Sequence, residues 1–223
     1  MYFCCVSQFI NVTKEYTDWR MDKKNISGFV LTGGKSSRMG SDKGLMPFDR
    51  KPLVLHALET LDEVAGQVMI SANDAVYRQF SHPVVPDVVH NIGPMGGIYS
   101  CLLQSATEFN IFLPCDMPFV PSDLFVWLLQ HIGDYSCAVP VHDGNKMEPL
   151  CVVYRKSCME TFAEFIEKGC YKVLDALAQL GYAAVKIDET TPFYDNHLFF
   201  NLNTLPDYHY ALQYIENRKK RES

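Results

Sequence analysis

The chain has 223 residues, of which 48% are hydrophobic and 21% are charged, and its formal net charge is -6. This size and composition are typical of one globular domain with a sizeable core. The acidic balance argues against nucleic acid or a membrane surface as a partner, because neither polyanion attracts a net-negative body.

Eight cysteines are present, and no two of them are spaced C-x-x-C. This spacing argues against a zinc knuckle and against a thioredoxin-like site. The N-terminal stretch lacks the basic segment and small-residue cleavage site of a signal peptide. No apolar run approaches the ~20 residues that a membrane span requires. These features together favour a reduced, cytoplasmic protein.

The chain alternates between strand-like and helix-like segments. Residues 1–25 show no clean periodicity and are interpreted as an N-terminal extension to a domain at 26–215, which is followed by a charged, solvated tail at 216–223. Strands are predicted near 26–31, 67–70, 83–86, 110–116, 137–141, 150–154 and 183–187, with a late strand ending near Asn203. Helices are predicted near 52–61, 75–80, before Ser105, and near 121–131, 159–166, 171–180 and from 206 onward.

This alternation predicts a single α/β domain with a three-layer, Rossmann-like architecture. The sheet is expected to be mostly parallel and to carry helices on both faces. Ligands of such sheets bind at the carboxyl ends of the strands. We therefore expect Leu31, Ser71, Asp87 and Asp116 to lie along one edge of the sheet.

The stretch from Leu31 to Met46 reads LTGGKSSRMGSDKGLM. It matches neither the G-x-G-x-x-G dinucleotide fingerprint nor the spacing of a P-loop. Its glycines, Gly33 and Gly34 among them, let the backbone approach a ligand closely, and its cations neutralise negative charge. It is interpreted as a triphosphate cradle, with Lys35 and Arg38 assigned to the phosphates by charge and position. The alternative is an ordinary solvated loop with basic residues by chance.

Asp116 ends the most apolar predicted strand and is well placed to hold Mg²⁺, which usually takes one or two protein oxygens together with substrate phosphates. The alternative is a turn residue before Pro118. No G-x-S-x-G motif is present, and His142 and His197 are expected to be hydrogen-bonded structural residues. A phosphate cradle with a metal carboxylate and no nucleophile suits direct phosphoryl or nucleotidyl transfer.

The motifs resemble those of a known family. LTGGKSSRMGSDKGLM is similar to the signature loop of the GT-A-like nucleotidyltransferases, and its R-M-G-x-D-K part resembles that of the molybdenum cofactor guanylyltransferases. The resemblance continues, in matching order over about residues 26–210, through these segments: Gly93-Pro94-Met95-Gly96-Gly97, Pro114-Cys115-Asp116-Met117-Pro118, Val141-His142-Asp143-Gly144 and Asn201-Leu202-Asn203-Thr204.

The resemblance implies transfer of GMP from GTP to the terminal phosphate of the molybdenum–molybdopterin cofactor, with release of pyrophosphate. Other cofactor-biosynthesis proteins and apo-molybdoenzymes would be further partners. The residues it implies are Leu31, Thr32 and Gly33 at the nucleotide, Lys43 at the phosphates, Ser71 and Asp87 in nucleotide recognition, Asp116 as the Mg²⁺ ligand and Asn203 as a second metal contact. Gly34 is added to the nucleotide contacts as part of the same glycine pair, and Arg38 and Lys35 are assigned to the triphosphate by charge and position.

Three departures from the family pattern bear on this assignment. Thr32 stands where the family usually has Ala, and Ser71 stands where some members have Asn. Glu148-Pro149-Leu150 replaces His-Pro-Thr in the region that faces the pterin, where a carboxylate disfavours a phosphorylated acceptor.

Three alternatives remain at this point. The first is a cytidylyltransferase of the same fold that acts on molybdopterin, and the second is a sugar- or polyol-phosphate nucleotidyltransferase. The third, from a different class, is a non-catalytic nucleotide-binding relative, against which the joint presence of Lys43 and Asp116 argues.

Overall fold

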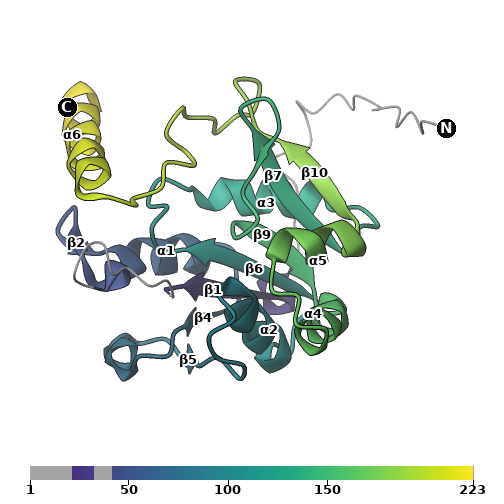
Figure 1. The fold of residues 1–223 in the computed structure, drawn as a ribbon. Coiled ribbons are helices and arrows are strands. Elements are labelled where there is room, and N and C mark those ends of the chain that lie inside the picture. The colour runs from purple at the N-terminus through teal and green to yellow at the C-terminus, as the bar shows by residue number, and fades with distance from the viewer. Residues whose placement is uncertain (1–21, 33–41, 223) are drawn as a thin grey trace.

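The computed structural model describes residues 22–32 and 42–222. Within them lie a large sheet, a two-stranded hairpin and six α-helices (Figure 1). The strands are β1 Ile26–Leu31, β2 Pro47–Phe48, β3 Lys51–Pro52, β4 Gln67–Ser71, β5 Val84–Val85, β6 Phe109–Pro114, β7 Cys137–His142, β8 Lys146–Met147, β9 Val152–Arg155 and β10 Tyr182–Lys186. The helices are α1 Leu53–Asp62, α2 Pro94–Gln104, α3 Ser122–His131, α4 Cys158–Glu167, α5 Val173–Leu180 and α6 Leu205–Glu222, with short 3₁₀ turns η1 Lys23–Asn25, η2 Lys43–Leu45 and η3 Ala75–Gln79.

The large sheet is mixed but mostly parallel, as predicted. Its strand order is β10-β7-β9-β6-β1-β4-β5, and β8 pairs with the edge of β7. Only β9 and the short β8 run against their neighbours; β9 lies antiparallel to both β6 and β7. The predicted strands at 137–141 and 150–154 have no helix between them, and a connection this short joins antiparallel strands, which is how β7 and β9 pair.

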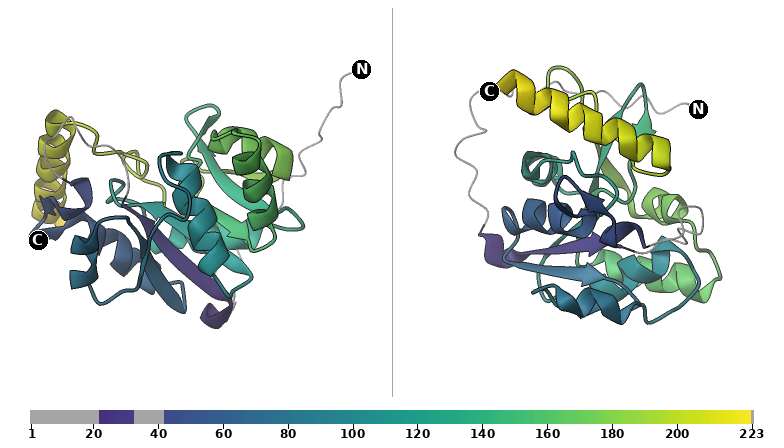
Figure 2. Two further views of the ribbon diagram at one scale, coloured as in Figure 1. Left: turned by 60° about the horizontal axis from the view of Figure 1, so that its bottom comes forward. Right: turned by 90° about the vertical axis from the view of Figure 1, so that its left-hand side faces the viewer.

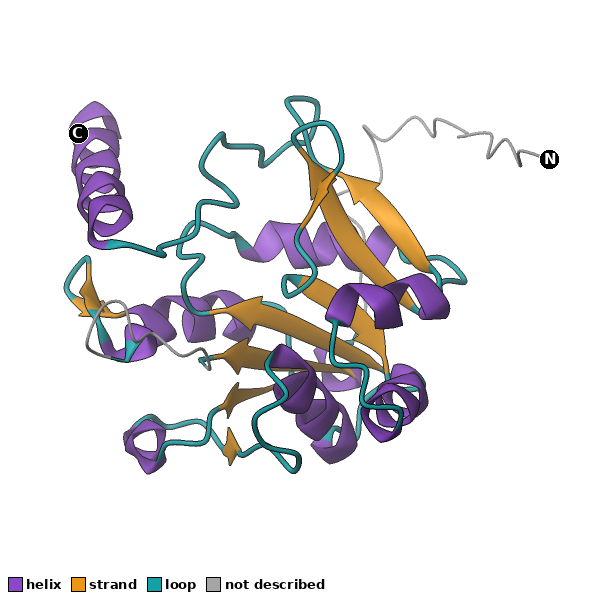
Figure 3. Ribbon diagram, viewed as in Figure 1, coloured by secondary structure: helices purple, strands orange, loops and turns teal. Residues whose placement is uncertain are grey.

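Helices cover both faces of the sheet (Figure 3). On one face α1 and α3 pack on the apolar side chains of the central strands, and Gly28 in β1 lets α1 approach so closely that an added Cβ would lie 3.1 Å from Leu61. On the other face α2, α4 and α5 bury Phe29, Phe112 and Tyr154. The three-layer α/β prediction is therefore confirmed.

The C-terminal helix α6 lies apart from these layers and beside the β2–β3 hairpin (Figures 1 and 2). A small third core joins them, in which Phe48 and Leu53 meet Leu202 and Ala211. The hydroxyl of Tyr208 donates to the carbonyl of Pro47. Residues 216–222, expected to be a frayed tail, form the last turns of this helix, and Lys219 bonds to Asp49 there. Residues 1–21 of the expected N-terminal extension lie outside the described part of the chain.

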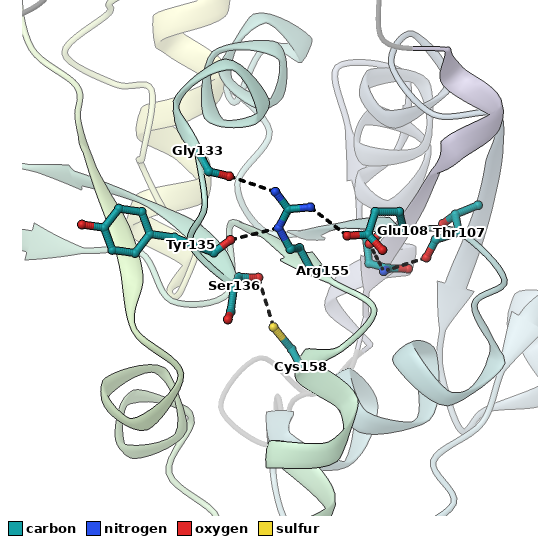
Figure 4. A network of polar contacts seen from close by, with 8 residues as sticks. Thr107, Glu108, Gly133, Tyr135, Ser136, Arg155 and Cys158 are labelled. Atoms are coloured by element: carbon teal, nitrogen blue, oxygen red, sulfur yellow. Dashed lines mark hydrogen bonds and ion pairs between the residues drawn. The ribbon is translucent and has the colours of Figure 1, made fainter.

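At the end of the sheet opposite the strands' carboxyl ends, Arg155 joins three segments (Figure 4). Its guanidinium donates to Glu108 at 2.7 Å, to the Gly133 carbonyl at 2.9 Å and to the Tyr135 carbonyl at 3.1 Å, and it lies over the ring of Phe109. This residue therefore ties β6 and β9 to the loop that follows α3.

Replacing Arg155 by alanine should lower the free energy of unfolding by about 1–2 kcal/mol, because two carbonyls and a carboxylate lose a charged donor. Glu108 is half exposed, so its share of that loss is small. Urea denaturation measures the change. The matched control is Lys168→Ala, which removes an exposed pair within α4 and should cost less than about 0.5 kcal/mol. Equal losses in the two variants would contradict the role given to Arg155.

Candidate active site

Four parallel strands end at one edge of the sheet, which we call the carboxyl edge. Strand β1 lies between β4 and β6, with Leu31 beside both Ser71 and Pro114, and Ser71 is in turn beside Val85. The loops that follow these strands carry Thr32, Asp87 and Asp116. The predicted clustering of strand-end residues is therefore confirmed.

A lysine, a carboxylate and an amide meet at the carboxyl edge. The Nζ atom of Lys43 lies 2.9 Å from Oδ2 of Asp116 and 2.9 Å from Oδ1 of Asn203. The Lys43 and Asp116 side chains are only 18% and 19% exposed, so water screens this pair less than a surface pair. Two oxygens from distant parts of the chain thus converge on one cation.

The backbone around each of these three residues is held in place. Asp42 precedes η2, and its carboxylate accepts the Gly44 amide, which fixes the turn that carries Lys43. The Leu202 amide donates to the Asp116 carbonyl at 2.9 Å, so the segment with Asn203 runs alongside the loop after β6.

The segment that carries Asn203 is not the late strand that the sequence suggested. Residues 197–204 are irregular, and a capping box between Thr204 and Asp207 starts α6 immediately after them. The prediction was wrong because the backbone amides here are used by the Asp116 carbonyl and the Asp207 carboxylate and join no sheet ladder.

A second cluster lies at the same edge, beyond β4. An added Cβ on Gly97, in the first turn of α2, would lie 2.8 Å from Oγ of Ser71, 3.5 Å from Oδ1 of Asp87 and 3.7 Å from Leu31. The glycine therefore lets Ser71 and Asp87 approach the first turn of α2 closely. Negative charge at Asp87 is also favoured by the amino end of α2.

The Asn73 side chain holds Asp87 at two points. Its Nδ2 donates to Oδ2 of Asp87 at 2.9 Å, and its Oδ1 accepts the Asp87 amide at 2.9 Å. The other carboxylate oxygen, Oδ1, is directed toward Gly97. The sequence identified Asn73 only as part of a turn, since nothing local indicates that a residue after β4 reaches the loop after β5.

A cavity of about 280 Å³ opens beside the β7–β8 turn. It is lined by His142, Asp143, Lys146, Tyr194, Asp195, Asn196, Phe199, Phe200 and Asn201. The Oδ1 atom of Asn201 is buried and has no hydrogen-bond partner among the described residues. Aromatic walls together with an amide oxygen that has no partner in the described part of the chain suit a flat, heteroatom-rich ligand.

The two histidines are hydrogen-bonded, as predicted. Nδ1 of His142 lies 2.9 Å from Asp143 and Nε2 lies 2.9 Å from Glu148, while its ring stacks on Phe199 at 4.3 Å. Nε2 of His197 lies 2.8 Å from the hydroxyl of Tyr210.

Glu148 is the carboxylate that departs from the family pattern. It also bonds to Lys146 at 2.9 Å. His142 contacts the same carboxylate at 2.9 Å. The negative charge of Glu148 near the cavity therefore has two partners.

Of the residues predicted for the site, Leu31, Thr32, Lys43, Ser71, Asp87, Asp116 and Asn203 all lie at the carboxyl edge or in the loops that leave it. The residues Gly33, Gly34, Lys35 and Arg38 lie outside the described residues. Within the described ranges no three His, Cys, Asp or Glu side chains gather to hold a metal ion by themselves.

The chain was compared with known proteins. Residues 28–181 match the family model of the MobA-like NTP transferase domain. The chain belongs to this family. A molybdenum cofactor guanylyltransferase from Acidovorax ebreus is 35% identical over 213 residues, which cover 89% of this chain and 100% of the relative. One from Cupriavidus metallidurans is 35% identical over 199 residues, covering 85% of this chain and 95% of the relative.

Solved structures agree with this assignment of the fold. The molybdopterin-guanine dinucleotide biosynthesis protein A of Archaeoglobus fulgidus superposes with a TM-score of 0.69 at 23% identity, over 86% of this chain and 99% of that one. The chain therefore shares the mostly parallel α/β fold of that protein. Its family and curated relatives make it an enzyme of the nucleotidyltransferase class. No helix in residues 22–32 and 42–222 has both the length and the apolar character that a membrane crossing requires.

Proposed function

We propose that this chain transfers GMP from GTP to the molybdenum–molybdopterin cofactor. An oxygen of the acceptor's terminal phosphate would form a bond to the α-phosphorus of GTP, and the bond between that phosphorus and the α–β bridging oxygen would break to release pyrophosphate. The observation that carries the proposal is the convergence of Lys43, Asp116 and Asn203 at the carboxyl edge, in a chain whose relatives are named for this reaction.

Asp116 and Asn203 are the residues that would hold Mg²⁺. Their oxygens already surround the ammonium of Lys43, and a carboxylate with an amide oxygen is a donor set that fits a hard cation bound jointly with phosphates. When bound, the metal would neutralise charge on the triphosphate. Lys43 would then bind a phosphate oxygen, stabilising the negative charge that builds on the departing pyrophosphate.

The cluster beyond β4 would bind the base. Guanine presents two adjacent donors, N1–H and the 2-amino group, and a carboxylate can accept from both. Asp87 is the carboxylate of that cluster, and Asn73 keeps one of its oxygens directed toward Gly97. Cytosine offers no such donor pair. We therefore favour GTP over CTP.

The cavity beside the β7–β8 turn would receive the pterin of the acceptor. Asn201 lines the cavity, and Asn203, two residues later, lies at Lys43 and Asp116. A ligand in the cavity can therefore present its phosphate to the metal and the α-phosphate. Lys146 and His142 both contact the Glu148 carboxylate. These contacts reduce the repulsion that the carboxylate would otherwise exert on a phosphorylated acceptor.

The test follows pyrophosphate release from purified protein supplied with Mg²⁺, molybdenum cofactor and one of GTP, CTP, ATP or UTP. Release with GTP that depends on the acceptor is expected. Release with CTP but none with GTP would overturn the base assignment and favour the cytidylyltransferase. Release with GTP and a sugar phosphate, but none with the pterin cofactor, would overturn the acceptor.

Replacing Asp87 by alanine should lower kcat/KM for GTP by about 10- to 100-fold, because the donors of guanine lose a charged acceptor. For ITP, which lacks the 2-amino group, the loss should be smaller. The selectivity ratio of the two nucleotides in wild-type and variant measures the effect. Asp74→Ala, an exposed cap of η3 on the same side of the sheet, is the control and should leave that ratio unchanged. An unaltered ratio in Asp87→Ala would assign guanine recognition elsewhere.

Delivery of the product to other cofactor-biosynthesis proteins or to apo-molybdoenzymes, and a cytoplasmic location, stay predictions of the sequence.

A further inference from the structure

The Tyr77 side chain is a buried polar group that the proposed reaction does not use. It lies in η3 and is only 1% exposed. Its hydroxyl donates to Oδ1 of Asp42 at 2.5 Å, and the same oxygen accepts the Gly44 amide at 3.0 Å. A phenol from one loop therefore completes the cap of the turn that carries Lys43.

The Tyr77 hydroxyl remains a donor at neutral pH. Burial raises its pKa most, and the hydrogen bond to Asp42 raises it further, well above the usual value. The hydroxyl therefore stays protonated and keeps donating to the Asp42 carboxylate.

The turn fits closely around this hydroxyl. An added Cβ on Gly44 would lie 2.2 Å from Oη of Tyr77, far inside any allowed contact. Glycine is therefore required here by the approach of the phenol rather than by a left-handed backbone. Lys43 lies between Asp42 and Gly44, which both contact Tyr77.

We propose that Tyr77 is a positioning residue for Lys43: its hydroxyl, acting through Asp42 and Gly44, holds the 42–45 turn so that the ammonium of Lys43 meets the phosphate-binding site. This inference rests on the proposed function, in which Lys43 binds the triphosphate. The ring of Tyr77 fills the core and the hydroxyl sets the turn, so replacement by phenylalanine separates the two roles.

The chain provides a matched control in Tyr154. This tyrosine is also fully buried, in β9, but its hydroxyl has no hydrogen-bond partner among the described residues. Tyr154→Phe removes the same atom from the core without touching the nucleotide site. It should leave nucleotide binding unchanged and should not lower stability, because the hydroxyl it removes is buried without a partner in residues 22–32 and 42–222.

The experiment is a double-mutant cycle of Tyr77→Phe with Lys43→Met, read by calorimetric titration with Mg²⁺ and GTP. Tyr77→Phe alone should weaken binding by about 3- to 10-fold, the loss expected for one hydrogen bond. In the Lys43→Met background it should change binding by less than about 2-fold, because residues that act through one another are not additive. Equal weakening in both backgrounds, or no weakening in either, would overturn the proposal.

The same double-mutant cycle, measured as thermal stability without nucleotide, tests the positioning role of Tyr77 separately from the proposed function. Tyr77→Phe should lower Tm by about 2–4 °C, the shift for one lost buried hydrogen bond in a chain of this size. This shift should shrink when Lys43 is replaced, since the Lys43 contacts to Asp116 and Asn203 are then already absent. A wild-type chain that binds no GTP would overturn the proposed function, whereas additive Tm shifts would overturn the positioning role alone.

Gly44→Ala tests the contact between the 42–45 turn and Tyr77 by changing the turn instead of the tyrosine. The new methyl group collides with Oη of Tyr77, so it should weaken Mg·GTP binding as Tyr77→Phe does. Combining the two changes should restore part of the loss, because removing the hydroxyl makes room for the methyl. Failure of the pair to improve on Gly44→Ala alone would count against the role of the hydroxyl.

Discussion

Replacing Asp116 by asparagine is expected to lower kcat/KM with GTP by about 10³-fold. The substitution keeps the shape of the side chain and removes its negative charge, so that a bound cation loses its strongest protein ligand. It also leaves the Lys43 ammonium with the Asn203 amide oxygen but without the carboxylate that it contacts in the wild-type chain. The loss of one preorganised electrostatic contact typically costs 10²–10³-fold, and weaker Mg²⁺ binding adds to it.

Pyrophosphate release measured over a Mg²⁺ titration tests this prediction, and the variant should require more metal for half-maximal rate. The control is Asp134→Asn, an exposed residue in the loop after α3, at the opposite edge of the sheet. Turnover of Asp116→Asn at the wild-type rate and metal concentration would remove this residue from the metal site.

Replacing Lys43 by methionine is expected to weaken Mg·GTP binding by about 10- to 150-fold. This corresponds to ~1.5–3 kcal/mol, the range for a hydrogen bond to a charged group. Methionine keeps the apolar stem and removes the ammonium. Calorimetric titration with Mg²⁺ and GTP measures the change, and Lys168→Met, at the exposed residue that caps the C-terminus of α4, serves as the control. Unchanged affinity would contradict the phosphate role of Lys43.

The same variant should act in the opposite direction on metal alone. In the nucleotide-free protein the Lys43 ammonium lies 2.9 Å from both candidate metal ligands, and a cation there opposes the entry of a second one. Its removal should therefore tighten Mn²⁺ binding, measured by electron paramagnetic resonance without nucleotide. Weaker Mn²⁺ binding in Lys43→Met would show that the lysine supports the metal site instead of competing for it.

The central part of the fold was predictable from local sequence. The apolar runs at 26–31 and 109–114 form β1 and β6, because a strand buried on both faces is a continuous apolar run. Asp116 follows such a run, so its place at the carboxyl edge also followed from local sequence. The direction of β9 relative to β7 also followed from the short connection between them. Its place beside β6 did not, because its apolar residues fit any interior position of a buried sheet.

The site was less predictable than the fold because its contacts join segments that are far apart in the chain. Asn73, which follows β4, makes two hydrogen bonds with Asp87, which follows β5. The Tyr77 hydroxyl donates to Asp42, which lies in a different loop. Neither pairing leaves a periodic signal, because one hydrogen bond between two turns imposes no pattern on the residues around it.

The sequence by itself determined the alternating elements, the cationic, glycine-containing composition of the stretch from Leu31 to Met46 and the carboxylate at the end of β6. These are local properties, set by side-chain polarity and spacing. Only the tertiary structure decided that Asn203 meets Asp116 at the ammonium of Lys43, and that a buried phenol holds the turn beneath that lysine. The reason is physical: sheet order and the docking of α6 bring these residues together, and both depend on which buried faces pack against each other.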